Sequence, residues 1–259
     1  MSTPAIHVRG LRRTFTLKNG PVHAVRGIDL TVERDQILGF LGPNGAGKTT
    51  TLRMLTTLLP PSGGRAEIAG HDLLADPAGV RRRIGYVAQS GGLDPGCGVR
   101  EELITQGRLH RLTKSQAGAR AEELAGDLAL LELMDRPTAA LSGGQRRRLE
   151  IALGLVNRPE VLFLDEPTTG LDPASRAELW QLVRRIRAEH GTTVFLTTHY
   201  LDEADALADR IVVVDAGAVV AEGTAAELKS RHTGDPAASL QDAFLAITGR
   251  TTAGEPLSI

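Results

Sequence analysis

The stretch GPNGAGKT, from Gly42 to Thr49, constrains the fold of this chain more than any other part of the sequence. It follows the continuous apolar run ILGFLG, typical of a buried parallel strand, and leads into the helical stretch KTTTLRMLTTL. Glycines at this spacing let successive backbone N–H groups converge on phosphate oxygens, and the following helix adds its positive end. The sequence therefore predicts a phosphate-binding loop between a buried strand and a helix.

Two side chains of this loop carry further chemistry. We expect the ammonium group of Lys48 to reach the β- and γ-phosphates of a nucleotide, and the hydroxyl of Thr49 to ligate Mg²⁺. A glycine-rich loop can also arise by chance, but here the strand before it and the helix after it supply the required context. A magnesium–nucleotide site is therefore expected at this loop.

Strand-like and helix-like runs alternate through most of the 259 residues. Apolar periodicity predicts a hairpin at IVVVDAGAVVAEG, with its turn at Asp215–Gly217, and strands at AIHVRGL, GIDLTV, RIGYVAQ, VLFLDEP and TTVFLTTH. This order predicts an α/β fold with a mostly parallel sheet covered on both faces. A helical stretch from Val99 to about Leu133 interrupts it and predicts a subdomain. SLQDAFLAITG predicts a last helix that Gly249 stops, and the final TTAGEPLSI is expected to be frayed.

Two acids end the apolar run VLFLDE. An aspartate at this place, Asp165, is where an enzyme with a phosphate-binding loop makes its Mg²⁺ contact. The adjacent Glu166 points differently and is placed to polarise an attacking water. Taken alone, two acids at a strand end would be solvated capping residues. The phosphate-binding loop upstream favours the catalytic interpretation.

Two further polar residues end predicted strands. Gln89 is placed to reach both the metal and the attacking water, although a lone glutamine at such a position is usually a surface residue. His199 follows FLTT, one strand after the acids, and we expect it to stabilise charge on the transferring phosphoryl group. A lone histidine at a strand end is more often structural, so its position relative to the acids carries this prediction.

A second glycine-rich motif, LSGGQ, runs from Leu141 to Gln145. Its amides and helix dipole predict a second anion site that faces outward. With LSGGQ in this order after the loop, the chain resembles the ATP-binding subunit of an ABC transporter over about residues 5–230. The resemblance implies an ABC ATPase fold with a parallel core sheet, an N-terminal antiparallel β part and a helical subdomain at about residues 92–158. It implies a nucleotide-binding domain over residues 1–230, and a short C-terminal helix and tail over residues 231–259.

The same resemblance implies a role for each motif. Asp165 ends Walker B, Glu166 is the general base and His199 the switch histidine. The metal contacts are implied at Thr49, Gln89 and Asp165. ATP contacts are implied at the D-loop Asp172 and at Walker A and signature positions Gly42, Pro43, Asn44, Gly45, Ala46, Gly47, Lys48, Thr49, Thr50, Ser142, Gly143, Gly144 and Gln145.

One aromatic residue and the expected assembly also follow from the resemblance. Phe15, in LRRTF, falls where the family has a ring that stacks on adenine, and an ordinary core phenylalanine is the alternative. The signature of one subunit is implied to meet the γ-phosphate held by the other, so that a homodimer sandwiches two ATP molecules. A membrane-spanning permease is the implied partner, with this chain peripheral at the cytoplasmic face of the cell membrane.

Several longer stretches are similar to drug-export subunits of the daunorubicin-resistance type. They are LLPPSGGRAEIAGHDL, VRRRIGYVAQ, RPEVLFLDEPTTGLDP, TTHYLDEADALADRI and SLQDAFLAITGR. Members of that group often carry glutamine at the switch position and an altered signature, whereas this chain has His199 and an intact LSGGQ. Export of lipids or polysaccharides, which related subunits perform, therefore remains an alternative.

Composition and motif spacing restrict the other classes. A net charge of −1 argues against a strongly basic nucleic-acid binder, and the triplets Arg81–Arg83 and Arg146–Arg148 are predicted to be solvated helix faces. The single cysteine, Cys97, fits a reducing compartment, and no apolar run suggests a signal peptide or a membrane span.

Soluble ABC ATPases and nucleotide-binding regulators are the two non-transport alternatives, and each has sequence features that can be compared with this chain. Soluble ABC ATPases of translation usually carry two such domains in one chain. Those of DNA repair insert long coiled coils before the signature, but here Ser142 comes only 93 positions after Thr49. The presence of Glu166 and His199 argues against a regulator that binds nucleotide without turnover.

Overall fold

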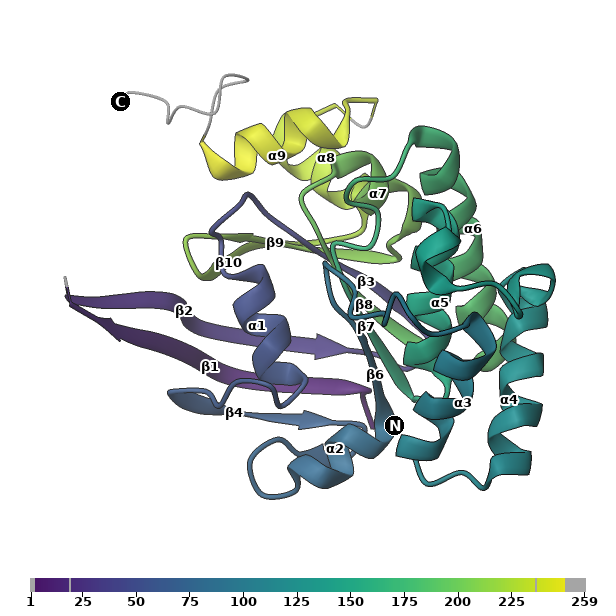
Figure 1. Cartoon of the computed structure of the whole chain (residues 1–259). Coiled ribbons are helices and arrows are strands. Elements are labelled where there is room, and N and C mark those ends of the chain that lie inside the picture. Colours follow the sequence, from purple (N-terminus) through teal and green to yellow (C-terminus); the bar gives the residue numbers. More distant parts are fainter. Residues whose placement is uncertain (1–2, 19, 236, 250–259) are drawn as a thin grey trace.

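A computed structural model describes residues 3–18, 20–235 and 237–249 (Figure 1). The predicted frayed segment TTAGEPLSI lies outside these residues. The described part contains two sheets with helices around them. The smaller sheet is antiparallel in the order β2-β1-β4-β5, formed by Ile6–Leu17 (β1), Gly20–Val32 (β2), Gly63–Ile68 (β4) and His71–Asp72 (β5). It forms the predicted N-terminal antiparallel part.

The larger sheet has the order β10-β9-β3-β8-β7-β6. Its strands are Ile37–Leu41 (β3), Ile84–Val87 (β6), Val161–Asp165 (β7), Thr193–Thr198 (β8), Arg210–Asp215 (β9) and Ala218–Gly223 (β10). Five of them pair in parallel, and β10 folds back antiparallel on β9 as the predicted hairpin. The parallel core sheet predicted from the sequence is therefore confirmed.

Both faces of the core sheet are covered, because β3, β7 and β8 are buried along their whole length. Alternate residues point to opposite faces of a strand. Phe40, Phe163 and Phe195 form one aromatic cluster, with ring centroids 5.3 and 5.4 Å apart, on the face toward the N-terminal sheet and helix α1 (Lys48–Leu55). Leu162 and Leu196 point to the other face, toward the helices α3 to α6.

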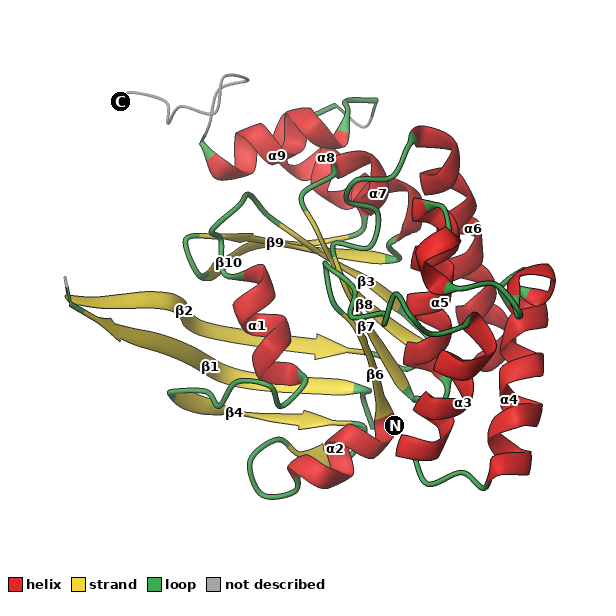
Figure 2. Cartoon of the chain, in the orientation of Figure 1, coloured by secondary structure: helices red, strands yellow, loops and turns green. Residues whose placement is uncertain are grey.

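The helices gather mainly on that second face, as Figure 2 shows. They are Val99–Leu109 (α3), Lys114–Asp127 (α4), Gly143–Leu155 (α5) and Pro173–His190 (α6), with short 3-10 turns at Leu131–Leu133 and Thr138–Ala140. A further helix, Pro77–Arg83 (α2), lies beside β5 and β6. The limits of a helical subdomain at about residues 92–158 stay a prediction.

The C-terminal helices are integrated with the rest of the chain. Helices Leu201–Leu207 (α7), Ala225–Thr233 (α8) and Leu240–Thr248 (α9) share a small apolar cluster with β9, and Gly249 ends α9 with φ 62°. Because α8 crosses residue 230, the predicted boundary there falls inside a helix, and this division of the chain stays a prediction. No helix in the described ranges combines the length and apolarity that crossing a bilayer requires.

Parallel strands place the predicted polar residues together. In an α/β sheet, the carboxyl ends of parallel strands meet at one edge, and ligands bind outside that edge. The loop after β3 begins at Gly42, Gln89 follows β6, Glu166 follows β7, and His199 follows β8. The topology thus brings segments from all parts of the chain to one site.

Candidate active site

The loop between β3 and α1 has a conformation that its glycines make possible. Gly45 and Gly47 have φ angles of 81° and 97°, in the left-handed region where a side chain is strained. A Cβ atom on Gly42 would overlap the carbonyl oxygen of Val214, so that position needs glycine for packing. Helix α1 begins directly after the loop at Lys48. Its free N–H groups and positive dipole end therefore face the space that the loop encloses.

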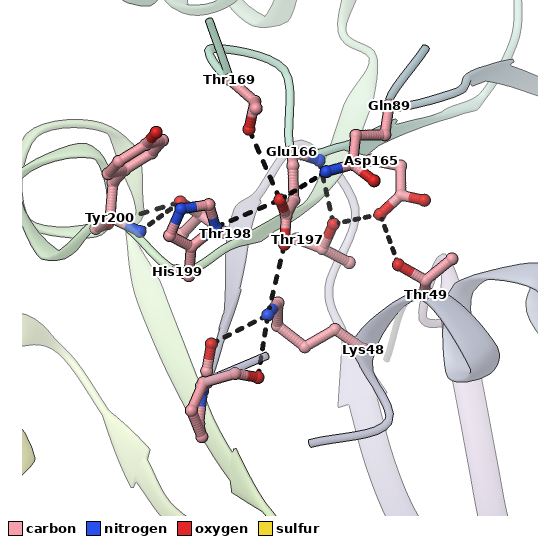
Figure 3. A network of polar contacts seen from close by, with 12 residues as sticks. Lys48, Thr49, Gln89, Asp165, Glu166, Thr169, Thr197, Thr198, His199 and Tyr200 are labelled. Carbon is pink, nitrogen blue, oxygen red and sulfur yellow. Dashed lines mark hydrogen bonds and ion pairs between the residues drawn. The ribbon is translucent and has the colours of Figure 1, made fainter. Parts of the chain in front are cut away.

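Lys48 is buried inside the curve of this loop. Its Nζ donates hydrogen bonds to the carbonyl oxygens of Gly42 at 2.8 Å and Pro43 at 3.1 Å. The same nitrogen lies 3.3 Å from Oε1 of Glu166, and both side chains are less than 10 % exposed (Figure 3). The loop and the end of β7 are thus joined by a buried ion pair.

Asp165 and Thr49 meet as oxygen ligands of one metal ion would. Thr49 Oγ1 donates to Asp165 Oδ1 at 3.2 Å, and Thr197 Oγ1 donates to the same oxygen at 2.6 Å. Mg²⁺ is typically held by one or two carboxylates together with waters and substrate phosphates. No group of three or more His, Cys, Asp or Glu side chains in the described residues could hold a metal by itself. The pair Thr49 and Asp165 therefore fits Mg²⁺.

Glu166 is the point where three strand ends converge (Figure 3). Its Oε2 accepts a hydrogen bond from Gln89 Nε2 at 2.9 Å and a longer one from Thr169 at 3.4 Å. His199 Nδ1 lies 3.1 Å from the same oxygen, although it makes no aligned hydrogen bond with it. The backbone of Glu166 has φ 43°, and its N–H donates to Thr197 O and Oγ1 at 3.1 and 3.0 Å. The predicted base, glutamine and histidine therefore share one site.

A cavity of about 370 Å³ opens in front of these groups. It is lined by Ala24, Asn44, Gly45, Gly47, Lys48, Thr49, Thr50, Gln89 and Glu166. Cavities of about 410 and 510 Å³ lie elsewhere, but neither contains the loop or the acids. Phe15 is half-buried and does not line the 370 Å³ cavity, and the guanidinium of Arg13 lies over its ring, 4.6 Å from the centroid. Its stacking on adenine stays a prediction.

The signature residues begin helix α5. Ser142 Oγ accepts from the N–H of Gln145 at 3.3 Å, and Gln145 Oε1 accepts from the N–H of Ser142 at 2.9 Å. Ser142 and Gly143 are exposed. Among the described residues, no hydrogen bond or ion pair joins this turn to the Gly42–Thr50 loop.

Asp172 caps helix α6. Its carboxylate accepts from the N–H of Ser175 at 3.0 Å and from the Ser175 hydroxyl at 2.6 Å. These hydrogen bonds, that of the hydroxyl first, lower the pKa of the Asp172 carboxyl. Gly144 lies beside this cap, since a Cβ there would approach Ser175 Oγ to 3.1 Å. The signature turn and the predicted D-loop are therefore neighbours in the same chain.

Two residues of this region were not found by sequence reasoning. Thr197 holds both acids, but it stands in a run of buried strand residues that gives no sign of this. Arg147 was predicted to lie on a solvated helix face, and that prediction is wrong, because the residue is 6 % exposed. It lies on the side of α5 that packs inward, while Arg146 is exposed. An arginine at a core-facing helical position was the available signal.

Comparison with known proteins decides the family. The family model described as ABC transporter matches residues 25–169, more than half of the chain. The chain belongs to the ABC transporter family. As an ABC protein, it shares 52 % identity over 235 residues with the daunorubicin resistance ATP-binding protein DrrA3 of Streptomyces coeruleorubidus, covering 91 % of this chain and 73 % of that protein. The predicted resemblance to the daunorubicin-resistance type is thus confirmed.

Two further similarities extend this comparison. The Nod factor export ATP-binding protein I of Ralstonia nicotianae is 42 % identical over 233 residues, or 90 % of this chain and 71 % of that protein. A dimeric ATP-binding cassette in a post-hydrolysis state with ADP and Pi has a TM-score of 0.77 and 25 % identity, covering 85 % of this chain and 98 % of that one. The predicted ABC ATPase fold and ATP hydrolase activity are confirmed for this ABC protein.

Proposed function

We propose that this ABC ATPase drives export of a daunorubicin-like compound through a membrane-spanning permease, from the cytoplasmic face of the cell membrane. The observation that supports an active motor is the convergence of Lys48, Gln89 and His199 on the carboxylate of Glu166. A regulator that only binds nucleotide would not need these groups around a base. The drug class is supported by the name of the Streptomyces relative.

The chain's own residues suggest how hydrolysis proceeds. The loop amides and Lys48 would bind the β- and γ-phosphates, and Thr49, Asp165 and Gln89 would hold Mg²⁺. When bound there, Mg²⁺ neutralises charge on the phosphate oxygens. A bound phosphate draws the Lys48 ammonium toward itself, and this frees Oε1 of Glu166. The freed oxygen then accepts a proton from the attacking water. Gln89 orients that water, and His199 stabilises charge on the phosphoryl group.

The adenine site and the second subunit complete this proposal. Arg13 covers one face of the Phe15 ring, and we assign adenine to the other face. The exposed signature Ser142–Gln145, with Asp172 nearby, serves the γ-phosphate bound by the other chain of a homodimer. The exposure of Ser142 and Gly143 at the start of α5 supports this arrangement.

Drug efflux from cells tests the whole proposal. The chain is expressed together with a candidate membrane-spanning permease, and daunorubicin efflux is compared between the natural sequence and Glu166→Gln. Glutamine keeps the shape of the side chain but accepts no proton, so we expect ATP binding to persist and efflux to stop. Equal efflux from both would contradict hydrolysis-driven export at this site.

Export of a lipid or a polysaccharide is the second candidate. The similarity to the Nod factor export protein favours it, as do the switch histidine and intact signature of this chain. It predicts ATPase activity that Glu166→Gln abolishes, together with no difference in daunorubicin accumulation between cells with and without the transporter.

A further inference from the structure

The middle residue of the triplet Arg146–Arg148 makes contacts that no proposed role accounts for. Arg147 Nε donates to Pro167 O at 2.8 Å, and Nη2 donates to Asp165 O at 3.2 Å. Nη1 donates to Ala88 O and to Glu150 Oε2, each at 2.7 Å. One buried guanidinium thus ties helix α5 to the ends of both β6 and β7.

These carbonyl groups flank two of the proposed site residues. Asp165 O and Pro167 O lie on either side of Glu166, and Ala88 O precedes Gln89. Glu166 has a positive φ of 43°, which is unfavourable for a glutamate and persists only when its surroundings hold it. Thr197 holds this turn from the side of β8, through the N–H of Glu166. Arg147 holds it through the carbonyls of Asp165 and Pro167.

The planar fork of arginine explains why this residue type stands here. A guanidinium offers five N–H donors in fixed directions and no acceptor, and it stays charged when buried. It can therefore bond carbonyls from two segments and a carboxylate at the same time. A lysine at this position would keep the charge, but its ammonium is a single point and would not span both segments.

Glu150 extends the contact to the segment after Gln89. Its Oε2 is held by Arg147, and a Cβ atom on Gly91 would overlap its Oε1. The Glu150 carboxylate is the end of a flexible side chain and can shift away from Gly91. Because the same carboxylate bonds Arg147 at 2.7 Å, such a shift changes its contact with Arg147. The position of the chain at Gly91 is thus mechanically linked to the turn at Glu166.

We propose that Arg147 is a positioning residue for ATP hydrolysis. It sets the distance between Gln89 and Glu166 by bonding the carbonyl groups beside both residues. Through Glu150, which bonds Arg147, the position of Gly91 affects this arrangement. This inference rests on the proposed function, in which Glu166 is the base. It assigns Arg147 no contact with ATP.

Steady-state kinetics of the full chain test the proposal, with Arg147→Gln, Arg147→Lys and Gly91→Ala as variants. Misplacement of a catalytic group by about 1 Å can slow a reaction about 100-fold, so we expect kcat to fall at least about tenfold in all three. The KM for ATP should change less than about twofold, because the phosphate-binding loop is untouched. Gly91→Ala and Arg147→Gln disturb the same contact. The fold-decrease in kcat of the double variant should therefore be much smaller than the product of the two single fold-decreases.

Two matched controls accompany these variants. Arg146→Gln changes the exposed neighbouring arginine, and Gly92→Ala adds a Cβ that meets nothing within 4 Å. Neither Gly91 nor Gly92 has a positive φ, so alanine is compatible with both backbones. Both controls should keep the natural kcat. Should Arg147→Gln fail to fold, Gly91→Ala and Glu150→Gln, measured against Gly92→Ala, carry the test alone.

The outcomes separate this proposal from the proposed function. Full kcat in Arg147→Gln or Gly91→Ala, restoration by Arg147→Lys, or multiplicative losses in the double variant would each overturn the positioning role. Glu166→Gln is assayed in parallel. If it hydrolyses ATP normally, the assignment of the base fails whatever Arg147 does. An inactive Glu166→Gln beside a fully active Arg147→Gln rejects the positioning role alone.

Discussion

At the scale of single residues, the carboxylate of Glu166 has a different partner on each oxygen. Oε1 lies 3.3 Å from the Lys48 ammonium, while Oε2 receives the Gln89 amide at 2.9 Å and faces His199. Burial of a charged pair is costly, and removal of one member leaves the other uncompensated. The two residues should therefore be coupled in stability as well as in catalysis.

Replacement of Lys48 by alanine tests this coupling. We expect ATP binding to be greatly weakened or hydrolysis lost, because the charge that faces the phosphates is gone. The fold should persist, with a free energy of unfolding lowered by up to about 3 kcal/mol through the unpaired carboxylate. The double variant with Glu166→Gln should be less destabilised than the sum of the single changes. Chemical denaturation and nucleotide titration measure both effects, and full turnover in Lys48→Ala would remove the phosphate-loop assignment.

A second buried acid makes a prediction about pH. Glu203 is fully buried in α7, where burial raises the pKa of its carboxyl. Contacts with Thr198, Thr168 and Trp180, whose Nε1 lies 3.4 Å from Oε1, oppose this rise only in part. A carboxyl group whose pKa is raised on folding stabilises the protein below its unfolded pKa of about 4.3 and loses this contribution as pH rises through the folded pKa. Glu203→Gln lacks this loss. The melting temperature of Glu203→Gln should thus gain on that of the natural protein as pH rises above about 4.3, and a difference that stays constant with pH would contradict the prediction.

At the scale of elements, the two helix starts near the signature are built differently. In α5, the capping box of Ser142 and Gln145 uses the amides of these two residues, while the first-turn amides of Gly143 and Gly144 have no acceptor within the helix. In α6, Asp172 uses its carboxylate to cap the Ser175 amide. Free amides therefore remain at the signature, where an anion is expected, and a negative charge stands at the neighbouring helix.

Removal of the α6 cap should loosen the start of that helix. In Asp172→Ala, the Ser175 amide loses its acceptor, so its hydrogen exchange should become faster and the melting temperature lower at neutral pH. Because the pKa of Asp172 is lowered on folding, its contribution is present above the unfolded pKa of about 3.9 and is lost as pH falls through the folded pKa. Asp172→Asn, which still offers an acceptor, serves as the control. Equal protection of Ser175 in Asp172→Ala and the natural protein would exclude a capping role.

At the scale of the whole molecule, the proposed dimer predicts that two inactive chains complement each other. Lys48→Ala in one chain and Ser142→Arg in the other leave one composite site with both lesions. The second site combines the intact Lys48 of one chain with the intact Ser142 of the other. If the signature serves the opposite chain, this second site should hydrolyse ATP.

Single-turnover hydrolysis by mixed dimers, isolated with two different tags, measures this effect. Coupling between sites does not hide activity in such an assay. If the signature served its own chain, every site in the mixture would contain a lesion. No hydrolysis above that of either inactive variant alone would therefore remove the support for a shared site.

Much of the site could be predicted because its motifs are local in sequence. The loop Gly42–Thr49 has to cradle phosphate through its own glycines and the following helix, and the acids stand directly after an apolar run. Parallel pairing then brings strand ends together, so Gln89 and His199 could be placed near Glu166 before their contacts were known. The partnership of Thr197 with both acids could not be predicted, because every residue of β8 is buried and the pattern marks none of them.

The sequence by itself determined the glycine-rich loop between β3 and α1, the parallel core sheet and the family, since each depends on residues close together in the chain or on the order of short motifs. Tertiary structure alone decided what Arg147 does. Charge and hydropathy favour solvent for an arginine, and the burial of this one depends on three carbonyl oxygens and a carboxylate, which lie on α5 and at the ends of two distant strands. The free energy of burying a guanidinium is set by the partners that folding delivers, and these are not neighbours in sequence.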